Sequence, residues 1–307
     1  MSLLVVGTVA YDSIETPFGK AEHILGGAGT YIGLAASYLY EPISLVSVIG
    51  EDFESRHLDL MRSRKLDLEG IEVRKGEKTF FWAGKYRTDL NTRDTIDTQL
   101  NVLATFDPKV PERLKHSEFL MLGNLLPDVQ KKVLKQMPKR PRLVVMDTMN
   151  FWMEHYWDSL MEGLQLTDVL TINDEEARLL SGEYALPLAA KKILQMGPKY
   201  LVIKKGEHGA LLFGEDKVFF APALPLEEVF DPTGAGDSFA GGFIGHLART
   251  GDVSFENMKT ALIYGSVMAS FCVERFGTER LQNLHVDEIN KRIRQFVELT
   301  QFEIPFE

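Results

Sequence analysis

The stretch from Asp231 to Phe243 has the residue types of an anion-binding helix start. It reads Asp-Pro-Thr-Gly-Ala-Gly-Asp-Ser-Phe-Ala-Gly-Gly-Phe and opens a helical pattern after an extended apolar segment. Gly234, Ala235 and Gly236 carry almost no side chain, so their backbone amides can converge on a ligand. The positive end of the helix dipole favours an anion at the same place. A simple tight turn before the helix is the alternative interpretation.

Asp237 occupies the first turn of this helix, next to the candidate anion site. A carboxylate is a poor ligand for phosphate, because like charges repel. It is better suited to take the proton from a hydroxyl group that is about to attack a phosphorus atom. A structural role stays open, because an acidic side chain in a first turn also stabilises the helix end.

Two stretches near the N-terminus have features of a substrate site. Asp12 follows the first apolar strand, where a carboxylate can accept two hydrogen bonds from a polyol, or can form an Asx turn. Gly26 and Gly27 open the run Gly-Gly-Ala-Gly-Thr-Tyr-Ile-Gly, whose spacing does not match a dinucleotide fingerprint. Tyr31 in the same run is able to stack on a ring or donate a phenolic hydrogen bond.

Two turns in the second half of the chain are further candidates. Asn173 and Glu176 have the spacing of a capping box at a helix start, and a carboxylate there also suits hydrated magnesium. The segment 204–210, with sequence Lys-Lys-Gly-Glu-His-Gly-Ala, links two apolar runs and by itself predicts a hairpin turn. Its Lys205 has the charge of a phosphate neighbour.

The elements that must position these residues alternate between buried strands and helices. This alternation predicts a three-layer α/β/α fold around a mostly parallel sheet, with ligands at the C-terminal ends of the strands. The expected strands are 3–6, 44–49, 119–122, 143–146, 169–172 and 200–203. The expected helices are 30–40, 53–65, 128–137, 151–164, 175–180, 188–196, 235–250, 256–274 and 287–299.

Two segments interrupt the alternation. Residues 13–25 are polar and rich in turn formers, and residues 71–103 alternate aromatic, β-branched and charged side chains, which is typical of antiparallel strands with one exposed face. For the second segment, a decorated loop is the alternative. We expect one domain over residues 1–307, in which both segments form a small β-sheet lid. Such a lid would exclude water from a phosphoryl-transfer site.

The composition argues against several classes of protein. With 44 acidic and 34 basic residues, the net charge of -10 argues against a nucleic-acid-binding surface. The single cysteine excludes an internal disulfide and fits a reducing cytoplasm, where we expect the protein. No run of apolar residues is long enough for a membrane span, and no P-loop motif or zinc-type spacing of Cys and His is present.

The string Asp-Pro-Thr-Gly-Ala-Gly-Asp-Ser-Phe at 231–239 resembles the C-terminal signature of the ribokinase-like carbohydrate kinases, the PfkB family. The glycine run at 26–33 resembles the N-terminal signature of the same family, and the resemblance covers nearly the whole chain. It implies that the segment Gly234, Ala235 and Gly236 forms an anion hole and that Asp237 is the catalytic base. It also implies substrate binding by Asp12 and by the paired glycines Gly26 and Gly27.

The same resemblance implies the cofactors and the remaining site residues. ATP and Mg²⁺ are expected, with K⁺ as a further ion near the anion hole. The implied nucleotide neighbours are Lys205, Gly206, Gly209 and Asn173, and Glu176 would hold the magnesium through water. The lid would also be a surface for homodimer contact. Tyr31 departs from the family pattern, because ribokinase-like members usually have an Asn there that holds sugar hydroxyls.

The first hypothesis is therefore an ATP-dependent kinase that phosphorylates a hydroxyl group of a sugar or nucleoside. A non-catalytic metabolite-binding protein on the same scaffold is the alternative from another class. A hydroxymethylpyrimidine or pyridoxal kinase of the same superfamily is a narrower alternative, which the predicted lid disfavours. The identity of the phosphate acceptor is not readable from these residues.

Overall fold

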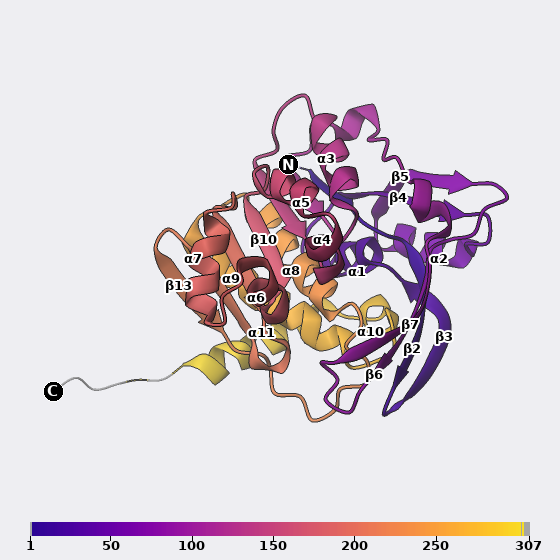
Figure 1. The fold of residues 1–307 in the computed structure, drawn as a ribbon. Helices are drawn as coiled ribbons and strands as arrows, with labels where there is room; N and C mark the ends of the chain where they lie inside the picture. The colour runs from indigo at the N-terminus through magenta and orange to yellow at the C-terminus, as the bar shows by residue number, and fades with distance from the viewer. Residues whose placement is uncertain (1, 302, 304–307) are drawn as a thin grey trace.

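A nine-stranded sheet forms the centre of the protein in the computed structural model, which describes residues 2–301 and 303 (Figure 1). The strand order is β13-β12-β11-β10-β9-β8-β1-β4-β5, and all neighbouring pairs from β11 to β5 are parallel. The strands of this sheet are β1 (Leu3–Val6), β4 (Ile43–Gly50), β5 (Leu66–Arg74), β8 (Phe119–Leu122), β9 (Leu143–Asp147), β10 (Val169–Asn173), β11 (Tyr200–Lys204), β12 (Ala210–Gly214) and β13 (Lys217–Ala221). Strands β1, β4, β8 and β9 are buried along their whole length, as the centre of a parallel sheet covered by helices requires, whereas the edge strands β5 and β13 are partly exposed.

Helices cover both faces of the sheet, so the predicted three-layer α/β/α architecture is confirmed. One face packs on α1 (Ala28–Ala36), α8 (Ala235–Thr250) and α9 (Phe255–Cys272). The other face packs on α3 (Pro127–Lys135), α5 (Trp157–Leu164), α6 (Asp174–Ser181) and α7 (Leu186–Leu194). The remaining helical elements are α2 (Ser55–Ser63), α4 (Asn150–His155), α10 (Glu279–Gln282), α11 (Val286–Thr300) and the short 3₁₀ turns Asn101–Thr105, Glu112–Leu114 and Gly206–His208.

A second sheet of four strands lies at one end of the molecule, in the order β3-β2-β6-β7 (Figure 1). Its strands are β2 (Ala10–Thr16), β3 (Gly19–Gly26), β6 (Phe81–Tyr86) and β7 (Arg93–Gln99). The two outer pairs are antiparallel, as expected for β6 and β7 from the pattern of residues 71–103, whereas the central pair β2–β6 is parallel. Every residue of β7 is exposed, so this sheet presents an open edge.

The element boundaries differ from the sequence expectation in two instructive places. The helical pattern of 151–164 is split into α4 and α5 at Tyr156, whose extended φ of -133° interrupts the helical backbone. The segment that begins at Ile71 first completes β5 at the edge of the main sheet, and only β6 and β7 belong to the second sheet. No helix in the described part of the chain combines the length and apolar character needed to cross a bilayer.

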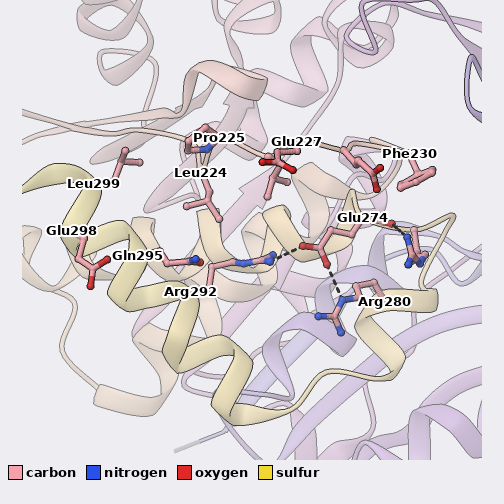
Figure 2. Close-up of a pocket in the computed structure, with 13 residues that line it drawn as sticks. Leu224, Pro225, Glu227, Phe230, Glu274, Arg280, Arg292, Gln295, Glu298 and Leu299 are labelled. Atoms are coloured by element: carbon pink, nitrogen blue, oxygen red, sulfur yellow. Dashed lines mark hydrogen bonds and ion pairs between the residues drawn. The ribbon is translucent and has the colours of Figure 1, made fainter.

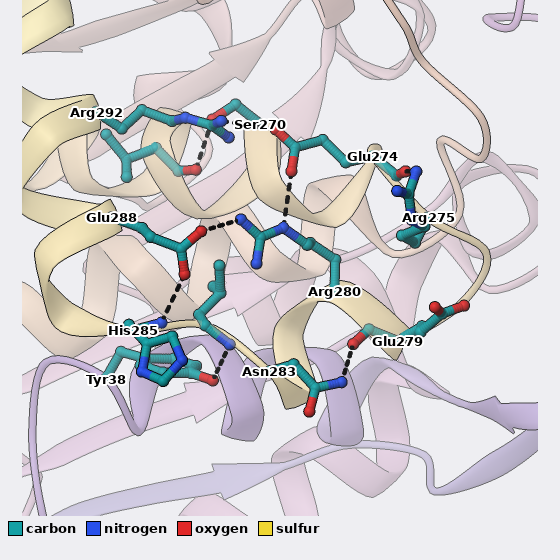
Figure 3. Close-up of polar contacts among 12 residues, drawn as sticks. Tyr38, Ser270, Glu274, Arg275, Glu279, Arg280, Asn283, His285, Glu288 and Arg292 are labelled. Atoms are coloured by element: carbon teal, nitrogen blue, oxygen red, sulfur yellow. Dashed lines mark hydrogen bonds and ion pairs between the residues drawn. The ribbon is translucent and has the colours of Figure 1, made fainter.

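The C-terminal helices are joined to one another by a network of ion pairs (Figure 3). Arg280 on α10 donates to Glu274 at 2.8 Å and to Glu288 at 2.5 Å, and Arg292 on α11 donates to Glu274 at 2.6 Å. The guanidinium of Arg292 also lies 3.6 Å from the ring centroid of Phe271, at the end of α9. Each charged group of this network therefore has an opposite charge in contact with it.

Candidate functional site

Asp237 lies in the first turn of α8, after a turn that the chain anchors through Asp231. The buried Asp231 carboxylate accepts hydrogen bonds from the Thr233 N–H and the Gly277 N–H, both at 2.8 Å. Gly234 is the N-cap residue with a left-handed φ of 74°, a conformation that favours glycine. The Ser238 N–H then donates to the Gly234 carbonyl at 2.8 Å and continues the helix. The signature therefore has a structural role of its own, because it fixes the position of Asp237.

The small residues of this turn are needed for close packing. A Cβ atom on Gly234 would lie 2.4 Å from the ring of Tyr31, and one on Gly236 would lie 3.2 Å from the Lys204 Nζ atom. Of the three expected amide donors, the Ala235 N–H is already used, because it donates to the Pro232 carbonyl at 3.1 Å. The first amides of any α-helix lack partners within the helix, so this end of α8 can still offer donors to an anion.

The ends of three parallel strands bring polar side chains to the same corner. On β11, Val202 lies in the core beneath α8, whereas Leu201 and Ile203 lie in the core of the opposite face. Because side chains alternate along a strand, Lys204 faces the α8 side. Its Nζ atom lies 2.8 Å from the Oδ2 atom of Asp147 at the end of β9. Asn173 at the end of β10 is the register partner of Lys204.

The electrostatic surroundings of Asp237 favour its protonated form. Burial and the nearby charge of Asp147 raise the pKa of Asp237 to about 7, against the lowering effects of Lys204 and Arg93. A carboxylate with a pKa near neutrality is poised to accept and release a proton.

Asp12 on β2 is also buried and lies against the paired glycines. A Cβ atom on Gly26 would lie 1.9 Å from the Oδ2 atom of Asp12, so the absence of a side chain at Gly26 makes room for this carboxylate. The Gly27 N–H donates to it, while burial and the charges of Asp231 and Asp237 raise the pKa of Asp12 to about 7. Asp12 and Asp237 are thus close enough to influence each other electrostatically.

Tyr31 lies on α1 with only 1% of its surface exposed, against Gly234. Its hydroxyl group is buried and has no hydrogen-bond partner in the described part of the chain. Burial, followed by the charge of Asp12, raises its pKa well above the usual value. Because a buried unpaired hydroxyl is unfavourable, this group has unused capacity to bond a ligand or a water molecule.

Asn173 and Glu176 form the predicted capping box at the start of α6. The Glu176 N–H donates to the Asn173 side chain at 2.7 Å, and the Asn173 N–H donates to the Oε2 atom of Glu176 at 2.8 Å. Burial and Asp147 raise the pKa of Glu176 to about 7. Within the described residues, no three His, Cys, Asp or Glu side chains come together as a metal site. A metal here would need ligands from phosphate and water, with the second carboxylate oxygen of Glu176 available to water.

The turn between β11 and β12 lies beneath the small sheet. Gly206 and Gly209 have left-handed φ values of 54° and 87°, and the Lys205 N–H donates to the Gly209 carbonyl at 2.8 Å. A Cβ atom on Gly206 would lie 2.8 Å from the Oδ1 atom of Asn91, in the turn between β6 and β7. The tip of the second sheet therefore touches the turn that was expected to bind nucleotide.

Two charged residues of this corner were not among the sequence candidates. Strand alternation places Lys204 and Lys205 on opposite faces of the sheet, but only the packing shows which face α8 covers. Arg93 on β7 lowers the pKa of Asp237 and of Asp12 through its charge, and its guanidinium lies 5.5 Å from the ring centroid of Trp82. No local pattern identifies Arg93, because only the pairing of β7 with β6 brings it to the site.

A hollow of about 790 Å³ lies elsewhere, between the segment 224–230 and the C-terminal helices (Figure 2). Leu224, Phe230 and Leu299 contribute apolar surface to it, and Arg280 and Arg292 point into it while paired with Glu274. None of the candidate site residues lines this hollow. Glu274 neutralises Arg280 and Arg292, whereas Arg275, which also lines the hollow, donates only to a backbone carbonyl.

Comparisons with known proteins identify the family and the fold of this chain. The sequence profile described as pfkB family carbohydrate kinase matches residues 2–283. A cytidine kinase of Thermococcus kodakarensis is 29% identical over 255 residues, which cover 81% of this chain and 89% of that protein. A nucleoside kinase of Methanothermobacter thermautotrophicus is 28% identical, over 99% of this chain and 98% of its own. An Escherichia coli protein solved in complex with ATP and Mg²⁺ superposes with a TM-score of 0.78 at 20% identity, covering 96% of this chain and 99% of its own.

Proposed function

Because this chain belongs to the pfkB family of carbohydrate kinases, we propose that it transfers the γ-phosphoryl group of ATP to a hydroxyl group of a sugar or nucleoside. The observation that carries the proposal is Asp237, a carboxylate with a pKa raised to about 7 in the first turn after the Gly-Ala-Gly segment. A base and an anion site next to each other are what a hydroxyl nucleophile and a phosphoryl group require.

In the proposed reaction, Asp237 takes the proton from the acceptor hydroxyl as its oxygen approaches phosphorus. A bond forms between that oxygen and the γ-phosphorus, the bond from the γ-phosphorus to the bridging oxygen breaks, and ADP leaves. The amides of the 234–236 turn and the positive end of α8 stabilise charge on the phosphoryl oxygens. The raised pKa helps, because a base matched to the operating pH accepts the proton with little loss of driving force.

The acceptor is proposed to lie between the small sheet and α8. Asp12 would accept hydrogen bonds from two hydroxyl groups of the acceptor, and the unpaired Tyr31 hydroxyl would donate a further one. Gly26 leaves space for the Asp12 carboxylate, and the Gly27 N–H donates a hydrogen bond to it. The lid formed by β2, β3, β6 and β7 would exclude water from the site.

Magnesium and a monovalent cation fit the residues around the proposed nucleotide. Glu176 would hold hydrated Mg²⁺ through water, with Asn173 beside it, and the ion would neutralise phosphate charge. Lys205, Gly206 and Gly209 would border the nucleotide from the β11–β12 turn. Asp231 is fully buried and forms no ion pair within the described residues, so K⁺ next to it would balance its charge.

The test is ADP release in a coupled assay across a panel of nucleosides and sugars, with ATP, Mg²⁺ and K⁺ present. Nucleosides come first in the panel, because the two relatives named above are a cytidine kinase and a nucleoside kinase. We expect acceptor-dependent ADP release with at least one compound, and lower activity when K⁺ is replaced by a bulky organic cation. Tight acceptor binding without ADP release would instead favour a metabolite-binding protein.

A further inference from the structure

Lys204 lies in the proposed phosphate corner between two elements, β9 and α8. Its Nζ atom lies 2.8 Å from the Oδ2 atom of Asp147, and the two side chains are only 16% and 6% exposed. The same nitrogen lies 3.2 Å from the position of a Cβ atom on Gly236, the residue before the proposed base. The amine is therefore fixed next to the backbone where the transferred group would have to lie.

The carboxylates around the Lys204 amine favour its charged form, and the amine keeps N–H donors for an anion. Besides Asp147, the carboxylates of Glu176 and Asp237 favour its protonated form, whereas burial opposes it. An ammonium group has three N–H donors, and the contact with Asp147 uses one of them. A nucleotide phosphate that enters this group of three carboxylates needs a compensating cation, and Lys204 is already in place on the rigid edge of the sheet.

We propose that Lys204 binds the transferred γ-phosphoryl group and that Asp147 holds the amine in position for it, an inference that rests on the proposed kinase function. Lys204 lies next to Gly236, the residue before Asp237, and Asp237 must be next to the acceptor oxygen that attacks the γ-phosphorus. The contact therefore falls on the terminal phosphate rather than on the part of the nucleotide that remains as ADP.

The test compares the binding of two nucleotides, so it does not depend on knowing the acceptor. Isothermal titration calorimetry measures the dissociation constants of Mg²⁺–AMP-PNP and Mg²⁺–ADP for the wild type, Lys204→Met and the control Lys199→Met. Loss of a charge-assisted hydrogen bond is expected to weaken AMP-PNP binding to Lys204→Met by about tenfold to a hundredfold. ADP binding should change little, and Lys199→Met, an exposed lysine next to the other end of β11, should bind both nucleotides as the wild type does.

The outcomes separate this proposal from the kinase function itself. If the wild type binds neither nucleotide, the kinase proposal fails. If the wild type binds both and Lys204→Met loses the same factor for each, or nothing for AMP-PNP, the assignment of Lys204 is overturned. Lys204→Met leaves Asp147 as a buried unpaired carboxylate, which can destabilise the fold. The double variant Lys204→Met/Asp147→Asn removes both charges and must show the same selective loss of AMP-PNP affinity.

Discussion

Two polar clusters of this protein contain similar residue types but differ in whether their charged groups form ion pairs. In the C-terminal network, Glu274 pairs with both Arg280 and Arg292, and Arg280 pairs also with Glu288. In the corner next to α8, Asp12 and Asp237 have no ion-pair partner among the described residues, and the pKa of each is raised to about 7. Paired charges hold helices together, whereas uncompensated buried carboxylates destabilise the fold unless a ligand or a proton neutralises them.

This difference in ion pairing indicates which of the two clusters is suited to catalysis. The network lies beside a hollow, yet the two arginines of the network that point into it, Arg280 and Arg292, are neutralised by Glu274 (Figure 2). The corner next to α8 has unused hydrogen-bonding capacity and raised pKa values, and these features are typical of catalytic sites. The size of a hollow is therefore a poorer guide to function here than the balance of charge.

The largest expected effect comes from Asp237→Asn, which removes the proposed base and keeps its shape. Turnover should fall by about 10²- to 10⁴-fold, the usual contribution of a general base. The melting temperature should stay the same or rise at neutral pH, because the substitution removes a buried charge that is unfavourable in the folded state. Steady-state kinetics and thermal unfolding at pH 7.5 provide the measurements. Wild-type turnover in this variant would remove Asp237 from the mechanism.

A smaller effect is expected from Asp12→Asn, which weakens the proposed contact with the acceptor. The KM for the acceptor should rise by about tenfold to a hundredfold, since charge-assisted hydrogen bonds are lost, while the KM for ATP stays the same. Glu15→Gln is the matched control on the same strand, because Glu15 faces the other side of β2 and pairs with Lys85. An increase in the KM for ATP alone would place Asp12 on the nucleotide instead.

In the C-terminal network, the substitution Arg280→Met should lower stability and leave activity nearly unchanged. Breaking its contacts with Glu274 and Glu288 should lower the free energy of unfolding by about 1–2 kcal/mol, since these partly buried groups lose a shared partner. The kcat should stay within a factor of about two, because the network does not contact the reacting groups. Arg275→Met is the control, since Arg275 is exposed and donates only to a backbone carbonyl. A loss of activity without a loss of stability would contradict this separation of roles.

The smallest expected effect is a difference in how pH changes the stability that the two clusters contribute: the sign of the change is opposite. The folded-state pKa of Asp237 is raised above its unfolded value of about 4, so its contribution to stability is present at low pH and is lost as the pH rises through about 7. Asp237→Asn should therefore melt only slightly above the wild type at pH 5 and well above it at pH 8. A gap of the same size at both pH values would show that the Asp237 pKa is not raised.

Glu288 provides the opposite case within the same measurement. Its pKa is lowered, first by the hydrogen bond from Arg280, so its contribution is present above an unfolded value of about 4.3 and is lost as the pH falls. Glu288→Gln should melt below the wild type at pH 7, and this difference should shrink towards pH 4. Parallel curves for the two variants would mean that the clusters do not differ in the way described here.

Most of the fold and part of the site were predictable from local patterns. The buried runs at 119–122, 143–146 and 169–172 lie within strands β8, β9 and β10, and the pattern at 235–250 matches α8. The capping box of Asn173 and Glu176 formed as its spacing predicted. These features depend on residues close together in the sequence, and for that reason a single sequence contains the information.

The remaining features depend on which distant segments meet. The sequence by itself determined the alternation of strands and helices, the glycine-rich start of α8 and the position of Asp237 within it. Only the tertiary structure decided that Lys204 rather than Lys205 faces this corner, that Arg93 lies near the proposed base, and that Gly26 makes room for Asp12. The physical reason is that burial and charge pairing are sums over neighbours from several elements, and no local pattern records which neighbours a side chain will have.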